Sequence, residues 1–237
     1  MLTLGAYVDA LRRDSSALAD AAERDLTAKV PSCPDWTMAD LVWHVGQVYE
    51  FWRQIAAGQL QDRSKVARRE RPADPEIVAW LRTEASALAE VLAAADPSTP
   101  VYSWSAQKDI AFIQRRMPQE TAVHRWDAQN AVGVPEPIDP ALAADGIDEF
   151  FQLMMPSDPF TVERTTVALE STEGDAWTVT AQAGVELVRG ARTADARARA
   201  SASDLLLLLW RRRTPDGIEI DGDRSALERF LAITDLT

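Results

Sequence analysis

The residues with the clearest chemical potential lie in the segment QETAVHRWD, residues 119–127. Glu120 and His124 are four residues apart, so on a helix both side chains lie on one face and can reach the same atom. Asp127 follows three residues later and shares that face. Carboxylate and imidazole groups are ligands of divalent metals. By itself, however, a glutamate and a histidine at this spacing are typical of a solvated contact on a helix surface.

The second of only two histidines favours a metal site over a surface contact. His44 lies in LVWHVGQV, among apolar residues, where a lone histidine is more often a hydrogen-bonded core residue. Two imidazoles and one carboxylate, with one position left open, form the ligand set of catalytic zinc sites and of the facial triad of non-haem iron(II) enzymes. Since both histidines fall in helices that we expect to be neighbours, the combination favours a metal site of His44, Glu120 and His124. Zinc is the metal expected first, but ligand type alone does not exclude iron or nickel.

Residues 1–155 are predicted to be helical almost throughout. Four helices are expected, at about 3–26, 37–57, 75–96 and 109–132. Thr37 and Asp40 form a capping-box pattern at the start of the second helix, and Gly58 is a suitable stop. In the fourth helix, Pro118 either begins the main body or kinks it. Four helices of similar length with short connections predict a four-helix bundle.

The remainder of the chain changes character. After a helix at 140–153, two segments rich in Val and Thr flank Gly174-Asp175 and predict a β-hairpin: FTVERTTVALEST and DAWTVTAQAG. Shorter strands are expected in VELVRG, ARARASA and GIEIDGD, and further helices in SASDLLLLLW and RSALERFLAI. The predicted fold class is therefore α+β multidomain, a helical bundle followed by a small α+β unit. Prolines cluster between residues 134 and 160, and we place the domains at 1–155 and 156–237.

Three stretches resemble parts of the mycothiol-dependent maleylpyruvate isomerase family. The stretch VPSCPDWTMADLVWHVGQV resembles the motif that opens the family's second helix, C-P-G-W-T-x-x-D-L-x-x-H, with Asp35 in place of the usual glycine. The stretch RRMPQETAVHRWDAQ is similar to the fourth-helix motif E-x-x-x-H-R-W-D, and DLLLLLWRRR resembles part of the second domain. The resemblance implies a DinB-like metal-binding bundle, a sterol-carrier-like C-terminal domain, and His44, Glu120 and His124 as metal ligands.

The resemblance also implies a reaction. In the family, zinc binds and ionises the thiol of mycothiol, the low-molecular-weight thiol of actinobacteria. A thiolate is the nucleophile, and a metal cation lowers the thiol pKa enough to form it near neutral pH. We expect either a cis-trans isomerase, in which the thiolate adds to a conjugated double bond, permits rotation and leaves, or a thiol S-transferase. The implied partners are a small-molecule thiol and an electrophilic or unsaturated acid.

Two other functions fit parts of the pattern. The first is a non-catalytic DinB-like metal-binding module whose C-terminal domain serves as a carrier or in dimerisation. Such a module does not need an open coordination position, whereas catalysis does. The second is a non-haem iron oxygenase, which shares the ligand set but usually has a β-barrel scaffold rather than helices.

Several residues are candidates for supporting roles around the metal. Asp127 is expected to orient His124, since metal-bound histidines usually donate their second N–H to an acceptor, or else to form a surface salt bridge with Arg125 or Arg116. Gln47 and Trp43 are expected to line the cofactor cavity, or else to be packing residues. Cys33, in a proline-flanked loop, is expected to pack rather than to act as a nucleophile.

Arginines are of interest because mycothiol is a polar glycoconjugate and maleylpyruvate is a dianion. Arg115 and Arg116 lie about one turn from Glu120. Arg211 and Arg212 end a helix, where cations complement the helix dipole and so have a structural explanation. We nevertheless expect one of these two to hold a substrate anion and so to support catalysis.

Bulk composition excludes several functional classes. The 237 residues include 25 Lys and Arg against 37 Asp and Glu, a net charge of -12 without a basic stripe, so nucleic-acid binding is not expected. The longest apolar run, residues 205–210, is far shorter than the roughly 20 residues of a membrane-spanning helix. The N-terminus carries charges where a signal peptide has its apolar segment, and a single cysteine agrees with a reducing compartment. We expect a cytoplasmic protein, and the sequence leaves its oligomeric state open.

Overall fold

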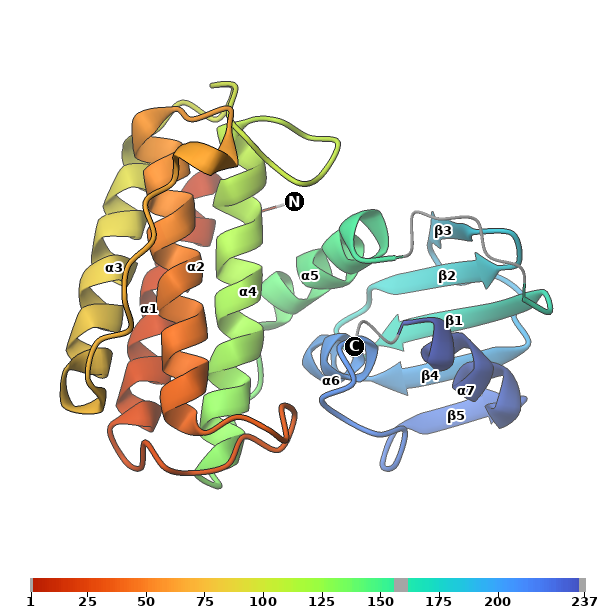
Figure 1. The fold of residues 1–237 in the computed structure, drawn as a ribbon. Coiled ribbons are helices and arrows are strands. Elements are labelled where there is room, and N and C mark those ends of the chain that lie inside the picture. The colour runs from red at the N-terminus through yellow and green to blue at the C-terminus, as the bar shows by residue number, and fades with distance from the viewer. Residues whose placement is uncertain (1, 156–161, 235–237) are drawn as a thin grey trace. The chain divides into compact units, whose positions relative to one another are not determined.

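The protein, seen in a computed structural model, is described over residues 2–155 and 162–234 and divides into two units, Met1–Glu136 and Pro137–Thr237. The first unit contains four long helices, α1 (Leu4–Ala22), α2 (Met38–Gly58), α3 (Asp74–Ala94) and α4 (Ile110–Ala131). Within it, α1 packs mainly on α4 and α2 on α3, while α2 also contacts α4 (Figure 1). The predicted four-helix bundle is confirmed, and its α2–α4 contact brings the two histidine-bearing helices together.

The ends of these helices follow local chemistry. The Thr37 side chain accepts a hydrogen bond from the Asp40 amide, and the Asp40 carboxylate accepts one from the Thr37 amide, so the predicted capping box at the start of α2 is confirmed. Gly58 is still helical, and Gln59 adopts the left-handed conformation that ends α2. The segment between α2 and α3, expected to be a loop, also contains a short 3-10 helix, η1 (Arg63–Lys65).

Pro118 lies inside α4, which begins at Ile110 behind an Asp109 cap. The alternative in which Pro118 starts the main body of the helix is therefore wrong. The core of the unit is apolar, and its fully buried side chains include Leu11, Leu18, Leu41, Ile55, Ile77 and Leu81.

Over its described residues the second unit is a five-stranded sheet with three helices; its strands and two of these helices were predicted for this unit, whereas the third was expected in the first domain. Its strands are β1 (Thr165–Ser171), β2 (Ala176–Ala181), β3 (Val185–Arg189), β4 (Ala196–Ala200) and β5 (Glu219–Gly222), in the order β3-β2-β1-β4-β5. Strands β1 and β4 are parallel and the other pairs antiparallel. Its helices are α5 (Pro140–Leu153), α6 (Ala202–Leu209) and α7 (Arg224–Ile233), and both α6 and α7 contact β1 and β4 (Figure 1).

Helix α5 belongs to this second unit, so the unit begins well before residue 156, where we expected it. The reason is packing. The Phe150 ring lies 5.3 Å from that of Trp210, and the Trp177 indole N–H donates to Asp148 at 2.9 Å. No helix in the described ranges is long and apolar enough to cross a membrane.

Candidate metal centre

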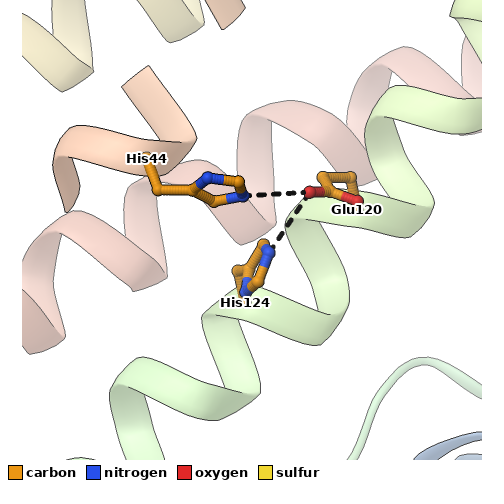
Figure 2. A group of neighbouring side chains, drawn as sticks. All are labelled: His44, Glu120 and His124. Carbon is orange, nitrogen blue, oxygen red and sulfur yellow. Dashed lines mark hydrogen bonds and ion pairs between the residues drawn. The ribbon is translucent and has the colours of Figure 1, made fainter. Parts of the chain in front are cut away.

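Three side chains from α2 and α4 converge on one point. The Nε2 atom of His44 lies 3.5 Å from Oε1 of Glu120, and the Nε2 atom of His124 lies 3.2 Å from the same oxygen. Figure 2 shows both imidazole rings directed at the Glu120 carboxylate. One donor atom from each residue lies within 4.8 Å of the other two. Among the His, Cys, Asp and Glu side chains of the described ranges, these three are arranged so that they could hold a metal ion.

The donor set suits a divalent cation such as zinc. Tetrahedral zinc with nitrogen and oxygen bonds of about 2.0–2.2 Å needs donor atoms about 3.3–3.6 Å apart. The two nitrogen–oxygen separations at Glu120 are 3.5 and 3.2 Å, so an ion fits between these groups with small side-chain movements. Three protein donors also leave one position open, as catalytic zinc sites require.

Asp127 fixes the orientation of His124. Its Oδ2 atom lies 3.0 Å from His124 Nδ1, and its Oδ1 atom accepts a hydrogen bond of 2.5 Å from the Ser32 hydroxyl. Asp127 is fully buried, and Ser32 lies in the loop that precedes α2. A carboxylate at Nδ1 favours the tautomer that leaves Nε2 free for a ligand, so the contact has the geometry of an outer-shell partner of a metal-bound histidine.

Arg116 provides charge balance on the far side of Glu120. It is buried on α4 and forms an ion pair with Glu120 Oε2, which leaves Oε1 to face the two histidines. Burial alone would raise the pKa of Glu120, but the Arg116 charge and the hydrogen bonds from His124 and His44 hold that pKa well below its usual range. Glu120 is therefore an anion at neutral pH, the form in which a carboxylate binds a metal.

Burial tends to lower the pKa of His124, but its hydrogen bonds with Asp127 and Glu120 outweigh this and raise that pKa to about 9. The imidazolium is thus stabilised between two carboxylates. The same concentration of negative charge stabilises a divalent cation in its place.

A cavity of about 310 Å³ opens beside His44. One wall consists of α2 residues from His44 to Trp52, including Gln47, and the other of residues 66–69. Trp43 does not line it, because the ring of Trp43 packs on that of Trp80 at 5.0 Å. Trp80 also explains Gly46, since a Cβ atom there would lie 2.3 Å from the Trp80 ring.

Family models match two regions of the sequence. The mycothiol maleylpyruvate isomerase N-terminal domain matches residues 7–129, and the MDMPI C-terminal domain matches residues 141–229. The chain belongs to the mycothiol maleylpyruvate isomerase family. Two crystal structures of a mycothiol-dependent maleylpyruvate isomerase, one of them a histidine-to-alanine mutant, have the same fold, with a TM-score of 0.65 and 11% identity over 93% of both chains. No curated protein matches the sequence.

The structure brings together most residues that the family motifs indicated. His44, Glu120, His124 and Asp127 form one cluster, and Gln47 lies in the adjoining cavity wall. The roles of Gln47 and Trp43 in cofactor binding, and that of Asp127 in catalysis, stay predictions.

Arg211 and Arg212 lie in the second unit of this family member, just after α6. Arg211 has a left-handed backbone with φ 60°, and the Arg212 guanidinium donates to the Trp210 carbonyl at 2.9 Å. The Arg212 guanidinium also lies 5.9 Å from the centre of the Trp210 ring. Binding of a substrate anion by either arginine stays a prediction.

Two residues that contact this cluster, Arg116 and Ser32, were not predicted from the sequence to pair with Glu120 and Asp127. Arg116 stands four residues before Glu120, the same spacing that identified Glu120 and His124, so this ion pair had a readable signal. Ser32 reaches Asp127 across 95 positions of the chain, and no local pattern announces that contact.

Proposed function

We propose that this protein is a mycothiol-dependent metalloenzyme, either a cis-trans isomerase like the maleylpyruvate isomerases or a thiol S-transferase. The observation that carries the proposal is the convergence of His44, Glu120 and His124 on one point, within the region that matches the family's N-terminal domain. Zinc is the proposed metal and mycothiol the proposed thiol. The proposed second substrate is an electrophilic or unsaturated acid, and the proposed location is the cytoplasm.

The cluster has the properties that thiol activation requires. A divalent cation held there lowers the pKa of a bound thiol, so that the nucleophilic thiolate forms near neutral pH. Glu120 supplies the negative charge that holds the cation, and Asp127 holds His124 with Nε2 directed at the cluster. Because the protein supplies three donors, a tetrahedral cation held there would have one position left for the sulfur. The half-buried His44 ring borders the cavity through which a second substrate would approach.

An isomerase of this kind would act in three steps: addition of the thiolate, rotation and elimination. The mycothiol thiolate forms a C–S bond to a carbon of a double bond conjugated to a carbonyl, and the electron pair moves onto the carbonyl oxygen. The former double bond is now single and rotates. The electron pair returns, the C–S bond breaks and the thiolate is released with the trans product. In an S-transferase the C–S bond is instead retained, and the enolate takes up a proton from water at its α-carbon.

The proposal is tested by metal identification combined with a thiol titration. Protein substituted with cobalt(II) is titrated with mycothiol, and with glutathione and bacillithiol as controls, while the visible absorption of the metal is followed. We expect mycothiol to change the spectrum at lower concentration than either control thiol. If no thiol changed the spectrum, the protein would instead be a metal-binding module without thiol chemistry.

A further inference from the structure

The segment that follows η1 is fastened to α2 at three points. The Gln54 side-chain amide makes two hydrogen bonds with the backbone of Ala67, of 3.1 and 3.0 Å. Arg69 then pairs with Glu50 at 3.3 Å, and Arg71 with Asp40 at 2.6 Å. The partners on α2 run backwards as the segment runs forwards, so residues 66–71 form a strap antiparallel to α2 (Figure 1).

Arg68 lies between two of these fastened positions and lines the cavity beside His44. Val66 and Arg68 both line this cavity and a neighbouring one that also includes Phe51. Because the strap is held at Ala67 and Arg69, the position of the Arg68 backbone is fixed relative to α2. Arg68 thus belongs to a cavity wall whose backbone is held in place, although its side chain is exposed.

The charge of Arg68 is uncompensated. Within the part of the chain that the structure describes, Glu50 is the carboxylate of the cavity wall, and it is paired with Arg69. Arg68 forms no ion pair there. Residues 61–72 carry five cations and two carboxylates, and the pairing of Arg69 with Glu50 and of Arg71 with Asp40 leaves this segment one positive charge in excess, in a chain of net charge -12. This cavity therefore presents a cation to any molecule that lies beside His44.

The remaining lining favours a small carbon chain. Val48, Phe51, Trp52 and Val66 supply apolar surface, and Gln47 supplies an amide near His44. We propose that this cavity binds the carboxylate of a small unsaturated acid and that Arg68 is the residue that recognises it. The inference rests on the proposed function, because it assigns the acid, rather than the thiol, to this side of the metal centre. A guanidinium binds a carboxylate through two parallel hydrogen bonds, whereas an uncharged glycoconjugate such as mycothiol has no need of an unpaired cation.

The test uses the zinc-loaded protein and maleate, a cis-unsaturated dicarboxylate, with maleamide as its uncharged analogue. Binding is measured by ligand-observed NMR titration at fixed ionic strength. We expect Arg68→Gln to weaken maleate binding by about tenfold or more, because a charge-assisted hydrogen bond is lost. Arg68→Lys should lie in between, because it keeps the charge but loses the planar fork. Arg24→Gln, which removes an exposed arginine that lines neither cavity, should bind maleate as the unaltered protein does.

Further arms separate this inference from the proposed function. Maleate can also ligate a metal, so the titration is repeated after chelation, where the effect of Arg68→Gln must persist. Arg68→Gln should leave zinc content and the response to mycothiol unchanged. If maleate bound equally well to Arg68→Gln, or did not bind the unaltered protein, the inference would be overturned while thiol activation stood. If mycothiol did not perturb the metal but maleate binding still depended on Arg68, the proposed function would fail and the carboxylate site would remain.

Discussion

Helices α4 and α6 are both largely buried, yet they are built from opposite kinds of residue. Helix α6 buries five consecutive leucines, Leu205 to Leu209, against its own unit. Helix α4 buries an arginine, a histidine and an aspartate on the face that carries Glu120, namely Arg116, His124 and Asp127. An apolar side chain stabilises a fold simply by leaving water, whereas a buried charge costs several kcal/mol unless it is paired.

The polar groups on this face of α4 form a chain of pairs. Arg116 meets Glu120, Glu120 meets His124, and His124 meets Asp127. Replacement of such a chain by apolar residues of similar size is often neutral or stabilising, so stability alone does not account for its presence. The contrast indicates that α6 serves the core and that this face of α4 serves a site. Three substitutions in α4 and α6 test this contrast, and a fourth tests the cap of α2, the helix that carries His44.

The largest effect is expected from Arg116→Met in the metal-free protein. Without Arg116, only the two histidines remain to balance the buried Glu120 carboxylate, and the loss of one partner of this buried ion pair should lower the free energy of unfolding by about 4 kcal/mol. Denaturant unfolding measures the loss. Saturating zinc should restore part of it, because the cation again balances Glu120. Arg24→Met, on an exposed position, should change stability by less than about 0.5 kcal/mol. Equal stability of the two variants would show that the Arg116–Glu120 pair does not contribute to the free energy of unfolding.

The counterpart in α6 is Leu208→Ala. Its fully buried side chain leaves a cavity on truncation, and the unfolding free energy of the second unit should fall by about 3 kcal/mol. Zinc content per chain, measured by elemental analysis, should not change. Loss of zinc from this variant would contradict the assignment of α6 to the core alone.

A smaller effect is expected from Asp127→Asn. The amide no longer holds His124 as a carboxylate does, and zinc affinity should fall by about 10–100-fold while the ligands stay in place. Competition with a chromophoric chelator measures the change. Asp35→Asn, in the exposed loop before α2, is the matched control and should bind zinc normally. An Asp127→Asn variant with unaltered affinity would leave only a packing role for this carboxylate.

The smallest effect is expected from Thr37→Ala at the start of α2, which removes the cap and should cost about 1 kcal/mol. Hydrogen bonds from the Thr37 hydroxyl and amide, together with Arg71, lower the pKa of Asp40 to about 2. Since the folded pKa lies below the unfolded value of 3.8, this stabilisation is present above pH 4 and is lost as the pH falls towards 2. Acid unfolding should therefore begin at higher pH in Thr37→Ala than in Thr83→Ala, an exposed control. Coincident acid transitions would argue against the capping box.

Much of this molecule could be predicted from local patterns. Apolar periodicity, Thr37, Pro75 and Gly174 are enough to place helices, a cap and a hairpin turn, because each acts within a few residues. The convergence of three side chains could be predicted from Glu120 and His124 at one-turn spacing together with His44, the second of two histidines, because both histidines lie on helices expected to be neighbours. Contacts formed only by packing could not be predicted, such as that of Ser32 with Asp127, or the strap that places Arg68 in the wall of the cavity that His44 also lines. The affiliation of α5 with the second unit depends on aromatic contacts of Phe150 and Phe151 with residues far along the chain.

The most direct test of the account is the metal content of protein purified without chelator. Elemental analysis should find one divalent ion per chain in the unaltered protein and in the Asp35→Asn control, and almost none in His44→Ala or His124→Ala. Circular dichroism should show that the helical content of these variants is retained. Full metal occupancy in His44→Ala, or no stoichiometric metal in the unaltered protein, would contradict the assignment of His44, Glu120 and His124 as the metal site.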